Sequence, residues 1–179
     1  MRKVFALLFI LTIFLLLILI SKVSLTGIGS EGKEYKIEIK DLSKNITVLE
    51  KEVIEEERVV IAFINSVEDK PVYEIYKIKD GCFLLESIVY QAPYAGYIYS
   101  QEVPLTKTIT LIPDINETYE KISFLYGWVG NHTLYICSSS KYFEVDESKD
   151  SVRVIGEAIP LHKYIENGDI VEIRIERSN

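Results

Sequence analysis

The sequence predicts an all-β protein, a small antiparallel sandwich or barrel that follows one N-terminal transmembrane helix. Three observations lead to this prediction. Residues 4–20 are apolar apart from Thr12, and the rest of the chain consists of short runs in which apolar and polar residues alternate. Turn-forming residues separate these runs at close spacing, which is typical of sandwiches and small barrels. With 179 residues the chain is long enough for one domain with its own core.

The N-terminal segment has the composition of a membrane helix. Its 17 residues, apolar apart from Thr12, follow Arg2 and Lys3, and as a helix they would span about 26 Å, close to the thickness of a thin hydrocarbon core. A cleaved signal peptide and an uncleaved anchor are both compatible with this pattern. Only weak small-residue cleavage patterns occur around residues 24–29, so we favour the anchor. Basic residues before the helix place the N-terminus in the cytoplasm and the remainder outside.

We therefore expect a membrane anchor at residues 1–24, a Gly/Ser linker at 25–34 and an extracytoplasmic β domain at 35–179. The protein would be a single-pass protein of the cell membrane, or a secreted one if the N-terminal segment is cleaved.

The first strands follow from alternation. Within residues 35–40, "YKIEIK", Tyr35, Ile37 and Ile39 lie on one face and charged residues such as Glu38 on the other, as in a half-buried strand. Residues 46–53 continue as a second strand after a turn, and "EEER" at 55–58 is expected to be a solvated turn. Residues 59–65, "VVIAFIN", are almost all apolar, which indicates a central strand buried on both faces.

A hairpin follows at residues 72–79 and 82–90, because Asp80 and Gly81 favour a tight turn between two strands. Residues 159–168 could form one helical turn. Shorter strands are predicted at 108–112, 121–129, 133–138, 141–145 and 169–176.

The charge of the domain excludes one class of partner. Without residues 1–24, the chain has 17 basic and 27 acidic side chains, which gives a net charge of −10. Such a surface repels phosphate backbones, so no nucleic acid is expected as a partner. The scarcity of Gln, with Ile, Lys and Glu abundant, suggests a heat-adapted, archaeal source.

The sequence offers little for catalysis. No nucleophile elbow, zinc-protease, phosphate-loop or dinucleotide motif occurs, and we predict no catalytic residue, no cofactor and no metal site. His132 and His162 are the two histidines, and we interpret both as surface or turn residues. We therefore expect a non-enzymatic protein.

Two kinds of covalent modification are candidates in an extracytoplasmic domain. Cys82 and Cys137 are the two cysteines, and they would either form a disulfide or remain as buried thiols. N-x-[ST] acceptor sites for glycosylation begin at Asn45, Asn116 and Asn131.

Two polar or aromatic segments are candidates for binding. Residues 89–100, "VYQAPYAGYIYS", place Tyr94 and Tyr97 around Gly96; these rings would either recognise a ligand or cap the open end of the core. In the corner "NSVEDKPVYE", Asn65, Ser66 and Glu74 would either bond the turn backbone or grip a partner. The predicted hairpin brings the chain after Tyr90 back beside this corner.

The stretch "FINSVEDKPVYEIYKIKDGCFLLESIVYQAPYAGY" resembles the domain-of-unknown-function family number eighteen-fifty. Ser66 and Val67 match its Ser-Val pair, Pro71 and Glu74 match its next two marks, and Gly96 matches the end of its glycine turn. Asn65 stands where the family usually has His, so a role that depends on that imidazole is not expected here. The resemblance covers roughly residues 34–176.

The resemblance implies a small exported or anchored β protein, often encoded beside the fused membrane subunit of a TAXI-type TRAP transporter, which takes up small organic anions. The expected function is thus a non-enzymatic accessory protein of such a transporter, and the expected partners are the bilayer and the transporter's membrane subunit or solute-binding protein. The alternative is a free-standing envelope module that binds a ligand or glycan.

Overall fold

The computed structural model describes residues 33–91, 101–127 and 131–178, and over these residues the protein is all-β with antiparallel sheets, as predicted. The apolar segment at residues 4–20, together with Tyr94, Gly96 and Tyr97, lies outside the described residues. Within the described ranges, no helix has the length and apolar character needed to cross a membrane.

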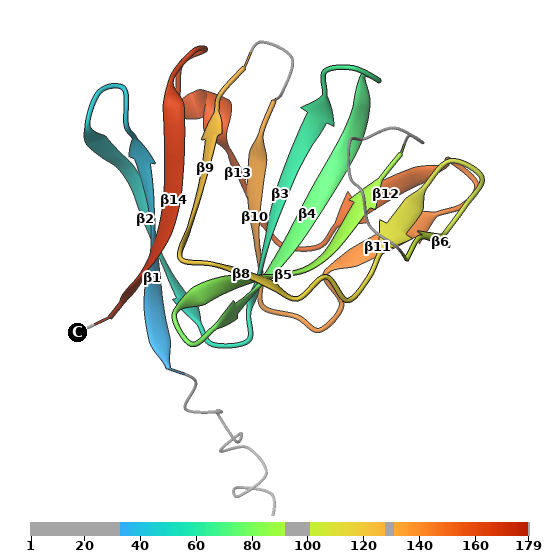
Figure 1. The fold of residues 1–179 in the computed structure, drawn as a ribbon, viewed down its shortest axis with the longest axis horizontal. Helices are drawn as coiled ribbons and strands as arrows, with labels where there is room; N and C mark the ends of the chain where they lie inside the picture. The colour runs from blue at the N-terminus through green and yellow to red at the C-terminus, as the bar shows by residue number, and fades with distance from the viewer. Residues whose placement is uncertain (1–32, 92–100, 128–130, 179) are drawn as a thin grey trace, which may run out of the picture. The chain divides into compact units, whose positions relative to one another are not determined.

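A four-stranded sheet contains both the first and the last strand of the domain. Strands β1 (Glu34–Asp41), β2 (Ile46–Ile54), β14 (Ile170–Arg177) and β9 (Lys121–Leu125) lie in the order β2-β1-β14-β9 (Figure 1). The predicted alternation fixes the register of this sheet: Ile37 faces Ile175, and Ile39 faces Ile173.

A larger sheet packs against the first. Its order is β13-β10-β3-β4-β5-β7-β6, with β8 paired to the other end of β5. The strands are β3 (Arg58–Asn65), β4 (Lys70–Lys79), β5 (Cys82–Tyr90), β6 (Val103–Pro104), β7 (Thr110–Ile112), β8 (Glu117–Tyr119), β10 (Thr133–Cys137) and β13 (Glu157–Pro160). A separate hairpin joins β11 (Phe143–Asp146) to β12 (Ser151–Val154), and a 3-10 turn spans Leu161–Lys163.

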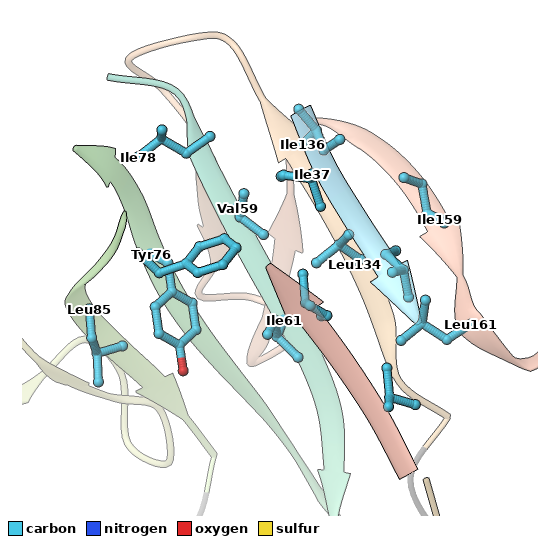
Figure 2. Packing of buried hydrophobic residues seen from close by; sticks show 14 of the residues in the cluster. Ile37, Val59, Ile61, Tyr76, Ile78, Leu85, Leu134, Ile136, Ile159 and Leu161 are labelled. Atoms are coloured by element: carbon cyan, nitrogen blue, oxygen red, sulfur yellow. The ribbon is translucent and has the colours of Figure 1, made fainter. Parts of the chain in front are cut away.

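The main core lies between the two sheets. Side chains of β1 and β14 form one hydrophobic cluster with those of β3, β4, β5 and β10. Figure 2 shows Val59 and Ile61 of β3 beside Leu134 and Ile136 of β10, with Ile37 of β1 among them. Of the two predicted architectures, sandwich and barrel, this face-to-face packing of two sheets corresponds to the sandwich.

The outer face of the larger sheet carries a second, smaller core. Val60, Ile75, Val89 and Cys137 point to this side, and residues of the β11–β12 hairpin such as Phe143 pack against them. Strand β3 is therefore buried on both faces, which confirms the prediction made from its continuous apolar run.

The hairpin of β4 and β5 turns where it was predicted to turn. Asp80 and Gly81 both have positive φ, 51° and 78°, the conformation that a two-residue hairpin turn requires. Further along, Ile75 pairs with Ser87 but Tyr76 pairs with Leu85, so Glu86 forms a β-bulge. The bulge divides β5 into a part that pairs with β8 and a part that pairs with β7.

Three details differ from the predictions. The strand predicted at 121–129 ends at Leu125, and the next residue, Tyr126, donates its N–H to Asp169 O at 2.8 Å. Glu38, expected on the solvent face, is only 6% exposed. The strands β6, β8, β12 and β13 were not predicted, since each spans only two to four residues, too few for a pattern.

Candidate ligand-binding cleft

A cleft of about 570 Å³ opens between β9 and the core-facing side of β3, β4 and β5. Its walls carry two charged side chains, Glu74 and Lys121, and five rings: Phe63, Tyr76, Tyr119, Phe124 and His132. This size and this mixture of rings with a few polar groups are typical of sites for small ligands.

Glu74 owes its position in the cleft to the alternation of β4. It lies on the same face as Val72 and Tyr76, which are 1% and 5% exposed. A carboxylate on a core-facing strand position is costly unless polar groups compensate it. The hydroxyl of Tyr76 donates a hydrogen bond of 2.8 Å to Glu74 Oε2. The acidic group is thus held in place inside a predominantly apolar wall.

His132 forms the opposite wall together with two phenylalanines. Its ring stacks on Phe124 with centroids 4.5 Å apart and on Phe63 with centroids 5.4 Å apart. Tyr126 packs against the same ring at 5.5 Å, and burial raises the pKa of Tyr126 above its ordinary value. The expectation of a surface or turn histidine is therefore wrong for His132, because its ring is half-buried in an aromatic stack.

Two tyrosines form a corner next to Glu74. The rings of Tyr76 and Tyr119 meet edge-on, with centroids 6.2 Å apart and planes at 81°. Tyr119 donates its hydroxyl hydrogen to Glu117 Oε2 at 2.5 Å. The corner therefore presents ring surfaces to the cleft and has carboxylates bonded to both hydroxyl groups.

The ammonium group of Lys121 is directed toward the other sheet face. Its Nζ lies 2.6 Å from Glu172 Oε2, and Glu172 is 6% exposed. The Lys121 side chain itself is 61% exposed. Lys121 therefore lies on the rim and is engaged by a buried carboxylate of β14.

A second hollow, of about 760 Å³, runs along the β11–β12 hairpin, but its character is different. Its lining is mainly charged, and Glu144 pairs with both Lys141 and Arg153 there. Ion pairs on an exposed hairpin are ordinary solvated surface. The cleft beside β9 is the better candidate for a site.

The structure separates the residues predicted for the corner. Asn65 Oδ1 accepts hydrogen bonds from the N–H groups of Val67 (2.8 Å) and Glu68 (3.3 Å), and Ser66 is exposed in the turn. Asn65 pairs with Lys70, four residues from Glu74 along β4, which corresponds to about 13 Å. Glu74 therefore belongs to the cleft, and Asn65 caps the turn.

The return of the chain toward this corner is as expected. Tyr90 pairs with Val72, and the N–H of Gln91 donates to Pro71 O at 3.2 Å. Tyr94, Gly96 and Tyr97 follow directly but lie outside the described residues, so their role stays a prediction.

The candidate disulfide is corrected by the strand order. Cys82 and Cys137 are both free thiols. Cys82 begins β5 and Cys137 ends β10, and β3 and β4 lie between these strands. Three strand spacings separate them by about 14 Å, twice the distance that a disulfide bridges between Cα atoms.

The three candidate glycosylation sites are all accessible. Asn45, Asn116 and Asn131 are exposed, and the first two have positive φ, 54° and 59°. Accessibility is a requirement for modification, and the modification itself stays a prediction.

The sequence contained a signal for the cleft that a search for motifs does not detect. The period of two places Glu74 on the face of Val72 and Tyr76. The position of His132 next to Phe63 depends on the pairing of Thr133 with Ala62, which the sequence does not show. Without knowledge of the strand order, however, nothing in the sequence brings β9 and its Phe124 to this place.

Comparisons with known proteins give one finding. No curated protein and no solved structure matches the chain. A family model described as "Domain of unknown function (DUF1850)" matches residues 59–142, the part that contains Phe63, Glu74, Phe124 and His132. Over these residues the chain is similar to the DUF1850 family, the family that its Ser-Val, Pro and Glu positions resemble.

Proposed function

We propose that this protein is a non-enzymatic binding domain, held at the outer face of a membrane, which receives a small solute in the cleft beside β9. We further propose that it serves there as an accessory protein of a TAXI-type TRAP uptake transporter. The observation that carries the binding function is the position of Glu74, a carboxylate on the core-facing side of β4 among aromatic rings.

The chemistry of the described side chains supports binding over catalysis. Burial raises the pKa of the Cys137 thiol to about 11, so at neutral pH this group is protonated and a poor nucleophile. The imidazole of His132 packs face-to-face between Phe124 and Phe63. An imidazole packed against two phenyl rings in this way is suited to forming part of the apolar wall of the cleft.

The membrane setting of the proposal rests on the sequence. The apolar residues 4–20 follow Arg2 and Lys3, as in a single-pass anchor with its N-terminus in the cytoplasm. The transporter setting rests on the resemblance to the family, with the membrane subunit or the solute-binding protein as the partner.

A free-standing envelope module is the second candidate function, and the cleft gives a specific reason for it. Rings such as Phe124 and Tyr119 offer flat apolar surfaces, which suit ligands and the faces of sugars. In this case the protein would bind its ligand equally well without a transporter present.

The binding function is tested with the full chain in a non-ionic detergent and a panel of organic anions, organic cations and neutral sugars. We expect at least one compound to raise the melting temperature of the wild type and to bind in titration calorimetry. Phe124→Ala should abolish this binding because it removes a wall of the cleft. Leu125→Ala is the matched control: Leu125 is the next residue of β9, is 64% exposed and does not line the cleft.

Circular dichroism of both variants shows whether they keep the β fold. If no compound binds the wild type, or if Phe124→Ala binds as the wild type does, the cleft is not the binding site and the proposal is wrong.

A further inference from the structure

We propose that Asn167 is a site of spontaneous deamidation, and that the fold slows this reaction by holding the backbone N–H group of Gly168 in a hydrogen bond to Tyr126 O. The modification would change the chain itself and is independent of the proposed binding function.

The sequence of one turn brings the two reacting groups together. Residues 166–169, Glu-Asn-Gly-Asp, contain the single Asn-Gly pair of the sequence. Deamidation of an asparagine begins when the backbone nitrogen of the next residue attacks the side-chain amide carbon. Glycine leaves that nitrogen unhindered, because it has no side chain. Both Asn167 and Gly168 are exposed and lie in a turn, so water has access to them.

The reaction has two steps. In the first, the nitrogen of Gly168 forms a bond to Asn167 Cγ, which closes a five-membered succinimide ring. The bond from Cγ to Nδ2 breaks, and the side-chain nitrogen leaves as ammonia with the proton that the Gly168 nitrogen has lost. In the second step, one water molecule opens the ring at either of its two carbonyl groups. The products are an aspartyl residue and an isoaspartyl residue, and no oxidant or reductant is consumed.

The fold engages the nitrogen that has to react. The N–H of Gly168 donates a hydrogen bond of 2.8 Å to Tyr126 O, and the N–H of Asp169 donates one of 3.2 Å to Glu166 O across the turn. Gly168 has a φ of 92°, a conformation that glycine adopts without strain. Because attack on Asn167 requires loss of the bond to Tyr126 O, the reaction proceeds from a locally opened turn.

The side chain of Asp169 holds the same turn. Its Oδ2 atom accepts the N–H of Glu166 at 3.3 Å and lies 2.7 Å from Lys44 Nζ. Lys44 belongs to the turn between β1 and β2, and its Nζ is also 3.2 Å from Glu166 Oε2. Both residues that flank Asn167 and Gly168 are thus fixed to another part of the fold. Loss of the Asp169 side chain should therefore make opening of the turn easier.

Deamidation would add a negative charge where carboxylates already gather. Glu166 and Asp169 share the ammonium group of Lys44 with the buried carboxylate of Asp41. An isoaspartyl product also adds a methylene group to the backbone, which changes the spacing of the hydrogen-bonding groups in the turn. The modification would therefore loosen the contact between the β1–β2 turn and the start of β14.

The test follows deamidation of each asparagine by peptide mass analysis of the full chain at mildly alkaline pH. One sample is folded in non-ionic detergent, and the other is unfolded in guanidinium chloride. We expect Asn167 to react before the other asparagines and to give both isoaspartyl and aspartyl products. Its rate should be about two- to tenfold lower in the folded protein, the factor that corresponds to one hydrogen bond.

Two variants and a control refine this test. Asn167→Gln should remove the modification, because ring closure through the longer side chain is much slower. Asp169→Ala should raise the rate in the folded protein about two- to tenfold and leave the rate in guanidinium chloride unchanged. Glu50→Ala is the matched control, because it removes another carboxylate that pairs with a lysine of the same sheet, Lys36. Asn167 should react in this control as in the wild type.

The proposal is wrong if Asn167 reacts equally fast in the folded and the unfolded wild type, or if another asparagine reacts before it in guanidinium chloride. Formation of the aspartyl product alone would also overturn it, because a succinimide ring opens in both directions. Circular dichroism shows whether Asp169→Ala keeps the β fold. If this variant does not fold, the comparison of folded and unfolded wild type decides the outcome.

Discussion

Single side chains in this protein show how a buried charge is made stable. Glu38 lies on the outer face of β1, yet neighbours cover it to 6% exposure. Its oxygens accept hydrogen bonds of 2.5 Å from Thr47 Oγ1 and 2.6 Å from Arg174 Nε. Burial alone would raise the pKa of Glu38, but these two hydrogen bonds and the charge of Arg174 outweigh it and lower the pKa to about 2.

The lowered pKa of Glu38 predicts how stability depends on pH. Because the folded pKa lies below the ordinary value of 4.5, the stabilisation is complete above pH 4.5 and is lost as the pH falls toward 2. Glu38→Gln should reduce the free energy of unfolding at pH 7 by roughly 1.5–3 kcal/mol, the range for hydrogen bonds to charged groups. Its melting temperature should also fall less between pH 4.5 and 2 than that of the wild type.

Calorimetric melting at several pH values checks this, with Glu157→Gln as the control for loss of an exposed carboxylate. Parallel curves for Glu38→Gln and the wild type below pH 4.5 would show that Glu38 is not the group responsible.

At the scale of elements, the fit of the chain between β12 and β13 against β10 is unusually close. A Cβ atom placed on Gly156 would lie 2.6 Å from Ile136 O and 2.7 Å from Cys137 Sγ. Strand β13 pairs with β10 through Ile136, so the carbonyl group cannot move away without disturbing the ladder. Because glycine has no Cβ atom, the chain after β12 can pass close to β10 while the hairpin of β11 and β12 packs against the outer face of the larger sheet.

Gly156→Ala is therefore expected to lower the free energy of unfolding by about 1–3 kcal/mol through overpacking. Gly127→Ala is the matched control, because a Cβ atom there meets nothing within 4 Å. It should be neutral or stabilising by up to about 1 kcal/mol, since alanine restricts the unfolded chain. Urea unfolding of both variants measures the difference, and equal stabilities would contradict the packing argument.

At the scale of the whole molecule, the proposal places an acidic β domain outside a membrane by means of residues 4–20. The full chain should remain in the membrane fraction after alkaline carbonate extraction, because an apolar helix of that length is not released by loss of electrostatic contacts. It should also co-purify with a co-expressed membrane subunit of a TAXI-type TRAP transporter. N-terminal sequencing that finds a mature start between residues 22 and 31 would contradict the anchor, and purification without the membrane subunit would favour the free-standing module.

The sequence by itself determined the strands that have enough residues to show a period. The alternation of Ile37 and Ile39, the apolar run at 59–65 and the turn at Asp80 and Gly81 all led to the observed elements. These features are local, because each strand's pattern reflects its own faces and each turn its own dihedral angles. The Ser-Val, Pro and Glu positions were also sufficient to indicate the DUF1850 family.

Only the tertiary structure decided which strands are neighbours, and the site depends on that. The order β10-β3-β4-β5 separates Cys82 from Cys137, and it brings His132 beside Phe63 and Glu74 into a cleft with Phe124 of the other sheet. The alternation within one strand shows which of its side chains are buried, but it does not show which other strand lies beside it. The neighbour is determined by the burial of whole sheet faces, which involves strands distant in sequence. For that reason Glu74 was a candidate from the sequence, but the partners that make it part of a cleft were not.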